Sequence, residues 1–103
     1  MSFNENSGQT ISLEEAAKMT KRYRDNHAGQ KQAAGFGVTT LQTILQQTDC
    51  IGIRSYYAQN DNGEMTLVLV GVKSNGDDLY QGQIMEFGAA CPPFCGSSNP
   101  LNS

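Results

Sequence analysis

The segment LVLVGV, residues 67–72, constrains the fold more than any other because it carries no polar side chain. Successive side chains of a β-strand point to opposite faces, so this strand would be apolar on both. A water-exposed edge strand does not tolerate that pattern. We therefore expect residues 64–73 to form the central strand of an antiparallel sheet.

Two more strands are expected beside it. Apolar and polar side chains alternate over residues 50–59, and the turn NDNG that follows is of the kind that closes a hairpin. After the turn KSNGDD, residues 79–88 have Ile84 and Phe87 on opposite faces and form a weaker third strand. The three strands predict a β-meander.

Two helices are expected before the sheet. Ser12 and Glu15 have the spacing of a capping box and basic residues follow, which predicts a helix over 12–26. Apolar residues at helical spacing predict a second helix over 38–48. The predicted fold class is α+β, with two N-terminal helices packed on a three-stranded antiparallel β-meander. An extended Pro/Cys C-terminal tail follows over 89–103.

The length of 103 residues is typical of one domain. We expect a polar flexible leader over residues 1–10 and a single domain over 11–103. The start of the chain has no basic segment followed by an apolar one, and no apolar run approaches the ~20 residues of a membrane span. A cytoplasmic protein is therefore expected, with non-classical export as the alternative.

The two-sided central strand also predicts a partner. Two short helices can cover one face of the sheet, so the other face needs the tail or a second copy of the chain. We expect a homo-oligomer, or complex formation with an unidentified protein, and we expect CPPFC to act as a rigid corner that directs an aromatic side chain. The predicted interaction residues are Leu67, Val68, Leu69, Val70, Val72 and Phe94.

The cysteines allow two kinds of chemistry. With the single histidine they make a Cys₃His set, which is numerically sufficient for a zinc or iron site, but CPPFC lacks the usual CxxC spacing. The two prolines hold the corner extended unless a turn or a cis peptide bond brings its ends within about 7 Å. Two separately packed thiols are thus favoured over a disulfide, and no cofactor is expected. The metal-ligand candidates are Cys50, Cys91, Cys95 and His27.

Two other classes of function have little support. The chain contains no HExxH, GxSxG or glycine-rich phosphate loop, so we expect a protein that is not an enzyme. The basic segment KMTKRYR suits a helix C-terminus, and the net charge is −3, so nucleic acid is not an expected partner.

The stretches GIRSYY, LVLVGVKSNG and CPPFC, taken together, resemble a group of short uncharacterised proteins from Bacteroidota. The resemblance covers about residues 35–102. It implies a bacterial origin and a standalone domain, and it transfers no activity, cofactor or catalytic residue.

The predicted function is therefore self-association or protein binding through the two-sided apolar sheet, with CPPFC as a clasp. One alternative is a metal-binding module built on the three cysteines. Another is an exported assembly or filament subunit with β pairing between copies.

Overall fold

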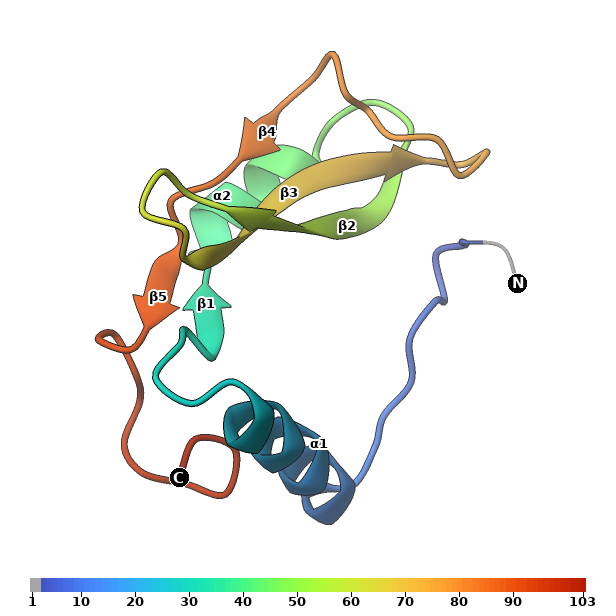
Figure 1. Cartoon of the computed structure of the whole chain (residues 1–103). Helices are drawn as coiled ribbons and strands as arrows, with labels where there is room; N and C mark the ends of the chain where they lie inside the picture. The colour runs from blue at the N-terminus through green and yellow to red at the C-terminus, as the bar shows by residue number, and fades with distance from the viewer. Residues whose placement is uncertain (1–2) are drawn as a thin grey trace.

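The computed structural model of the chain describes residues 3–103 and contains the predicted meander (Figure 1). Its strands are β2 (Cys50–Gln59), β3 (Met65–Lys73) and β4 (Ile84–Met85), in the order β2-β3-β4. β3 is thus the central strand, as its two-sided apolar pattern predicts. The chain is an α+β protein, which confirms the predicted fold class at that level.

The hairpin of β2 and β3 is the longest paired region. The two strands run antiparallel with Gln59 opposite Met65 at the turn, and the register shifts at a bulge between Cys50 and Gly52. Burial concentrates in the second half of β3, where leucine, valine and glycine residues fill the interior. The buried residues there are Leu69, Val70, Gly71 and Val72.

The third strand is much shorter than the predicted 79–88, because β4 pairs with β3 at two positions only, Ile84 and Met85. The preceding loop instead turns back on β3, where Leu79 donates its backbone N–H to the carbonyl oxygen of Gly71 at 2.8 Å. Beyond β4 the backbone of Phe87 has φ = 62°, a left-handed conformation that ends strand geometry.

A second, two-stranded sheet was not predicted. β1 (Ala33–Gly35) pairs antiparallel with β5 (Ala89–Cys91). β1 lies between the two predicted helices and β5 at the start of the predicted tail, and no strand was predicted at either place. Their residues are small, and a Cβ atom at Gly88 would lie 2.8 Å from the carbonyl oxygen of Gly35. Glycine there permits the close approach of the two segments.

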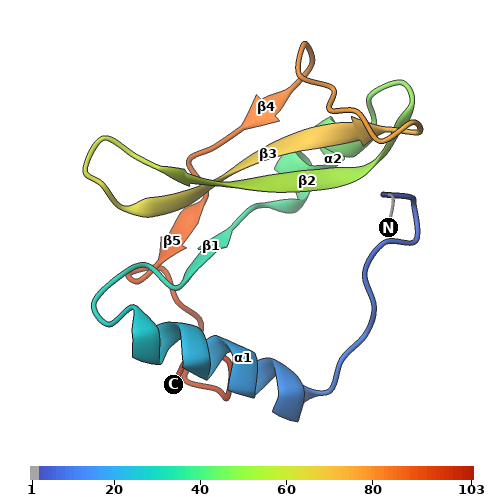
Figure 2. The same ribbon diagram turned by 45° about the vertical axis from the view of Figure 1, so that its right-hand side comes forward.

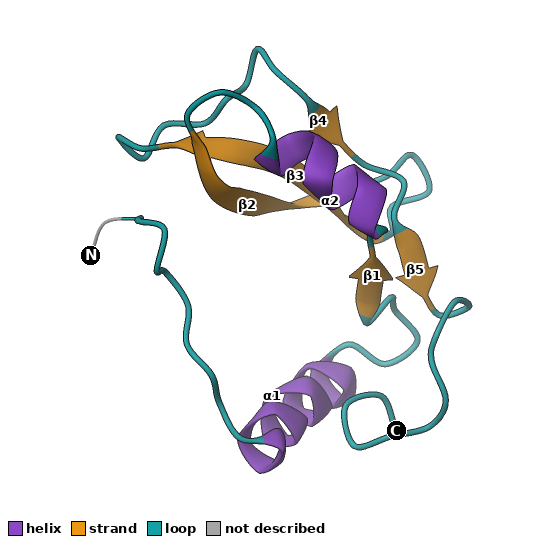
Figure 3. Ribbon diagram, turned by 180° about the vertical axis from the view of Figure 1, so that it is seen from behind, coloured by secondary structure: helices purple, strands orange, loops and turns teal. Residues whose placement is uncertain are grey.

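The two predicted helices are both present. α1 (Leu13–Asn26) starts at the predicted cap, where the Ser12 hydroxyl accepts the backbone N–H of Glu15 at 3.1 Å. α2 (Val38–Leu45) ends three residues before the predicted boundary at 48, and its Ile44 is fully buried. Figure 3 shows α2 lying across the meander.

The prediction that both helices pack on the meander is wrong for α1. This helix has no buried residue and lies beyond β1 and β5, away from β3 and β4 (Figure 2). Its half-buried side chains include Ala16, Ala17 and Thr20, which are too small to bury much apolar area. The helix reaches the central strand through Tyr23, whose hydroxyl lies 3.3 Å from the Met65 sulfur at the start of β3.

The N-terminal segment returns to the sheet. The Phe3 ring lies against Gly52, and the guanidinium carbon of Arg54 is 5.4 Å from the centre of that ring. Part of the predicted flexible leader therefore contacts β2, while residues 1–2 of that leader lie outside the described residues.

The chain is more open than a compact monomer of its size. Its radius of gyration is 15.0 Å, against about 13 Å for a compact domain of this length. Its accessible surface is 7521 Å², against about 5,700 Å² for a monomer of 11.1 kDa. Within residues 3–103, no helix has both the length and the apolar character needed to cross a membrane.

Candidate interaction site

The six predicted interaction residues fall into three groups. Leu69, Val70 and Val72 are buried within the chain, so they are not part of an uncovered sheet face. Leu67 and Val68 are half-buried near the start of β3. Phe94, at the proline corner, is 72% exposed.

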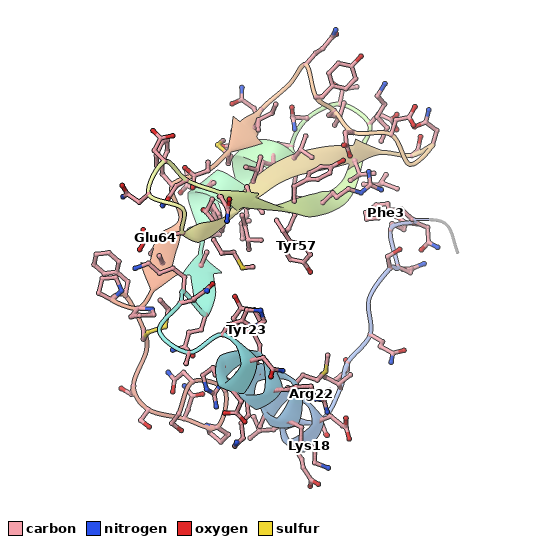
Figure 4. All side chains as sticks on the ribbon, in the orientation of Figure 1. Phe3, Lys18, Arg22, Tyr23, Tyr57 and Glu64 are labelled. Atoms are coloured by element: carbon pink, nitrogen blue, oxygen red, sulfur yellow. A yellow bond between two sulfur atoms is a disulfide. The ribbon has the colours of Figure 1, made fainter. Side chains whose placement is uncertain are left out.

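An apolar groove lies between the C-terminal part of α1 and the start of β3. Its cavity of 220 Å³ is lined by Tyr23 of α1, by the segment 31–34, and by Tyr57, Met65 and Leu67 of the hairpin, with Thr66 beside them. We call this the α1–sheet groove. Tyr57 is 84% exposed and projects from β2 toward Tyr23 (Figure 4). Leu67 is the predicted interaction residue that belongs to this groove.

The wall of the groove is held in place by polar contacts. The Tyr23 hydroxyl lies 3.3 Å from both the Met65 sulfur and the Lys31 carbonyl oxygen, and its single proton is shared between these two acceptors. The Lys31 ammonium lies 3.5 Å from a Glu64 carboxylate oxygen and donates to the Pro92 carbonyl oxygen at 2.8 Å. These contacts connect the hairpin tip, the α1–β1 connection and the proline corner, so the apolar side chains are presented on a fixed frame.

A charged cluster at the other end of the hairpin is structural. Asp78, after β3, accepts hydrogen bonds from the Tyr56 hydroxyl and the Arg54 guanidinium, which also donates to the Gly76 carbonyl oxygen at 3.2 Å. The Tyr56 hydrogen bond and then the Arg54 contacts hold the pKa of Asp78 below its usual value. The same hydrogen bond raises the pKa of Tyr56, and the one from Arg54 raises the pKa of Arg54. Both carboxylate oxygens are engaged, so the cluster fixes the loop after β3 to β2.

A second carboxylate is held in its ionised form near β4. The Thr66 hydroxyl donates to Glu86 at 2.6 Å, which is the main cause of a lowered pKa for Glu86, with the backbone N–H of Phe87 as the second.

The proline corner holds a disulfide. Cys91 and Cys95 are bonded, with Cα atoms 4.8 Å apart and cis peptide bonds before Pro92 and Pro93. The expectation of two separately packed thiols is therefore wrong. The corner closes on itself and its backbone is also tied by the Phe94 N–H, which donates to the Ala90 carbonyl oxygen at 2.8 Å.

The four metal-ligand candidates do not meet. The sulfurs of Cys91 and Cys95 are bonded to each other, and Cys50 is a free thiol on β2 whose Sγ lies 3.3 Å from the Gly52 carbonyl oxygen. His27 stacks on Tyr23 at 4.2 Å between ring centres. Within the part of the chain that the structure describes, no three His, Cys, Asp or Glu side chains gather as a metal site.

The chain was compared with models of protein families, with curated proteins and with solved structures, and none of them matches it.

Several groove residues were not predicted as interaction residues. Tyr56 and Tyr57 are consecutive on a strand, so their side chains point to opposite faces of the sheet. This pair was the one sequence signal that an aromatic side chain would lie on the face away from the Asp78 cluster. Tyr23 lies in the predicted helix 12–26 and in the basic segment KMTKRYR, and neither prediction gave it a role in protein binding. Lys31 and Gln32 lie between the two predicted helices, where no element or site was predicted and nothing in the sequence pattern distinguishes them.

Proposed function

We propose that this protein is not an enzyme and acts by self-association, with the α1–sheet groove of one copy covered by a second copy. The observation that carries the proposal is the accessible surface of 7521 Å², about a third more than a compact monomer of this mass exposes. A standard interface removes about 800 Å² from each partner, so the excess is large enough for a stable dimer.

The composition of the groove supports an interface. Tyrosine side chains supply large contact areas and are enriched among the residues that dominate binding energy. Tyr57 is the most exposed of the large apolar side chains in the groove, and Met65 beside it is adaptable in packing. Leu67 retains its predicted interaction role in this proposal, whereas the buried part of β3 does not.

Charge favours a second copy as the occupant. Residues 13–31 carry five basic and three acidic side chains, whereas residues 49–86 carry two basic and six acidic ones. When α1 of one copy faces the hairpin of another, opposite charges meet, and such complementarity selects and orients partners.

A second candidate is the exported assembly subunit, in which strands pair between copies. β2 is a ten-residue edge strand, and no backbone hydrogen bond joins its outer edge to another described segment. A long open edge is a template for β pairing. The Cys91–Cys95 disulfide favours an oxidising compartment over the predicted cytoplasmic location.

The test compares two tyrosine variants by light scattering coupled to gel filtration. Tyr57→Ser removes the exposed groove ring, and we expect it to weaken self-association at least about tenfold, as loss of a hot-spot aromatic does. Tyr80→Ser is the matched control, because Tyr80 is 68% exposed in the loop after β3 and does not line the groove. Equal effects of the two variants would contradict the groove as the contact surface. Wild-type association that both variants leave intact would favour the β2 edge.

A further inference from the structure

We infer that the proline corner is a site of thiol–disulfide exchange, at which an external thiolate attacks the sulfur of Cys95. This inference goes beyond self-association and concerns the disulfide of the proline corner, which lies beside the α1–sheet groove and shares Gln32 with its lining. It starts from the unequal exposure of the two bonded cysteines: Cys91 is 7% exposed on β5, whereas Cys95 is exposed. Exchange requires access to the attacked sulfur, so Cys95 is the reachable one.

The neighbourhood of Cys91 suits a leaving thiolate. The side-chain amide nitrogen of Gln32 lies 3.6 Å from Cys91 Sγ and 4.0 Å from Cys95 Sγ, within hydrogen-bond reach of sulfur. The backbone N–H of Gln32 donates to the Cys91 carbonyl oxygen at 2.7 Å, which fixes the two residues beside each other. A donor held in this position stabilises negative charge on the sulfur that leaves.

The Gln32 side chain also lowers the stability of the folded chain. Its side-chain oxygen Oε1 is buried and has no hydrogen-bond partner. An unpaired buried acceptor costs about 1–3 kcal/mol. The amide orientation that leaves Oε1 unpaired is the one that aims its nitrogen at both sulfurs, and this orientation is what the exchange reaction uses.

The reaction balances with thiols as the reductant. A thiolate sulfur bonds to Cys95 Sγ, the bond between Cys91 and Cys95 breaks, and its electron pair leaves on Cys91 as a thiolate. A second thiol then displaces Cys95, so two thiols are oxidised to their disulfide while the corner gains two electrons and two protons. The Lys31 ammonium donates to the Pro92 carbonyl oxygen at 2.8 Å and so fixes the backbone between the two cysteines, while its charge is paired with Glu64.

The first experiment uses the full chain with its third cysteine removed by Cys50→Ser, and reduced glutathione as the probe. Limited reaction followed by acid quenching and peptide mass spectrometry should find the mixed disulfide on Cys95 in large excess over Cys91. Equal labelling of the two cysteines would overturn the inference. A disulfide that stays intact at glutathione concentrations that reduce an unfolded control peptide of the same corner would overturn it as well.

A second experiment tests the positioning role of Gln32 without breaking the disulfide. Gln32→Leu removes the amide donor together with the unpaired oxygen, so the fold should be retained, and we expect glutathione to open the corner several-fold more slowly. Gln30→Leu, two residues earlier and exposed, should react at the wild-type rate. An unchanged rate of disulfide opening in Gln32→Leu, at unchanged thermal stability, would show that the Gln32 amide does not assist the exchange. Exchange can fail in either experiment while self-association persists, so the two proposals are tested separately.

Discussion

Tyr56 on β2 donates its hydroxyl hydrogen to the carboxylate of Asp78, a residue 22 positions further along the chain. This contact and the Arg54 ion pair join the edge strand to the loop that follows the central strand. The cluster therefore ties the loop after β3 to β2 through polar contacts.

The Asp78 cluster predicts acid sensitivity. The folded pKa of Asp78 is lowered, so its contribution to stability is present above the unfolded pKa of about 3.9 and is lost as the pH falls through the folded value. Glu86, whose pKa is also lowered, adds a second part in the same range. We expect the melting temperature of the wild type to fall below about pH 4 more steeply than that of Asp78→Asn.

Thermal unfolding followed by circular dichroism from neutral to acidic pH measures this difference. Asp61→Asn at the exposed hairpin tip is the control and should keep the acid sensitivity of the wild type. Parallel curves for the wild type and Asp78→Asn would show that the cluster contributes nothing to folding.

A methyl group at Gly71 should destabilise the sheet. Its Cβ would lie 2.9 Å from Cys50 Sγ, 3.0 Å from the Gln47 side-chain nitrogen and 3.1 Å from a Leu79 methyl carbon. Overpacking of this kind costs about 1–3 kcal/mol, so Gly71→Ala should lower the free energy of unfolding by that amount. Gly96→Ala, where no atom lies within 4 Å, should change it by less than about 0.5 kcal/mol in urea titrations. Equal stability of the two variants would refute the close packing at Gly71.

Phe87 should be replaceable by glycine with a gain in stability. Its backbone is left-handed, which costs an L-residue about 1–2 kcal/mol, and its side chain is 94% exposed and adds little packing. The greater freedom of glycine in the unfolded chain offsets part of this gain. We therefore expect Phe87→Gly to raise the free energy of unfolding by up to about 1 kcal/mol. Denaturant titration of dilute protein is the measurement. A clear loss of stability would mean that the Phe87 ring packs against another surface.

Arg24 should control the order of the end of the tail. Its two guanidinium nitrogens donate to the carbonyl oxygens of Leu101 and Ser103, both at 2.7 Å. Hydrogen bonds from a charged group are worth about 1.5–3 kcal/mol, so Arg24→Gln should speed amide exchange over residues 99–103 about tenfold or more. Arg22→Gln on the same helix is the control and should leave exchange there unchanged. Fast exchange already present in the wild type would contradict this role.

The sequence predicted elements whose pattern is local and missed those that depend on distant segments. The cap at Ser12 and the alternation of 50–59 each depend on neighbouring residues, and both were found where expected. The β1–β5 ladder joins short runs of small residues far apart in the chain, and three-residue strands have no measurable periodicity.

The candidate site was predicted less well than the fold. The apolar pattern of β3 correctly marked a central strand, but it could not show that Leu69, Val70 and Val72 would be buried within one chain. The disulfide was not favoured, because extended backbone before both prolines was expected to hold Cys91 and Cys95 apart. Gln32 could not be found from sequence, because only the pairing of β1 with β5 brings it beside Cys91.

The mass of the protein in solution tests the central claim most directly. Light scattering over a wide range of concentrations should give twice the 11.1 kDa of one chain, falling toward one chain on dilution. A mass of 11.1 kDa at every concentration, with no dye-binding apolar surface, would contradict self-association through the α1–sheet groove.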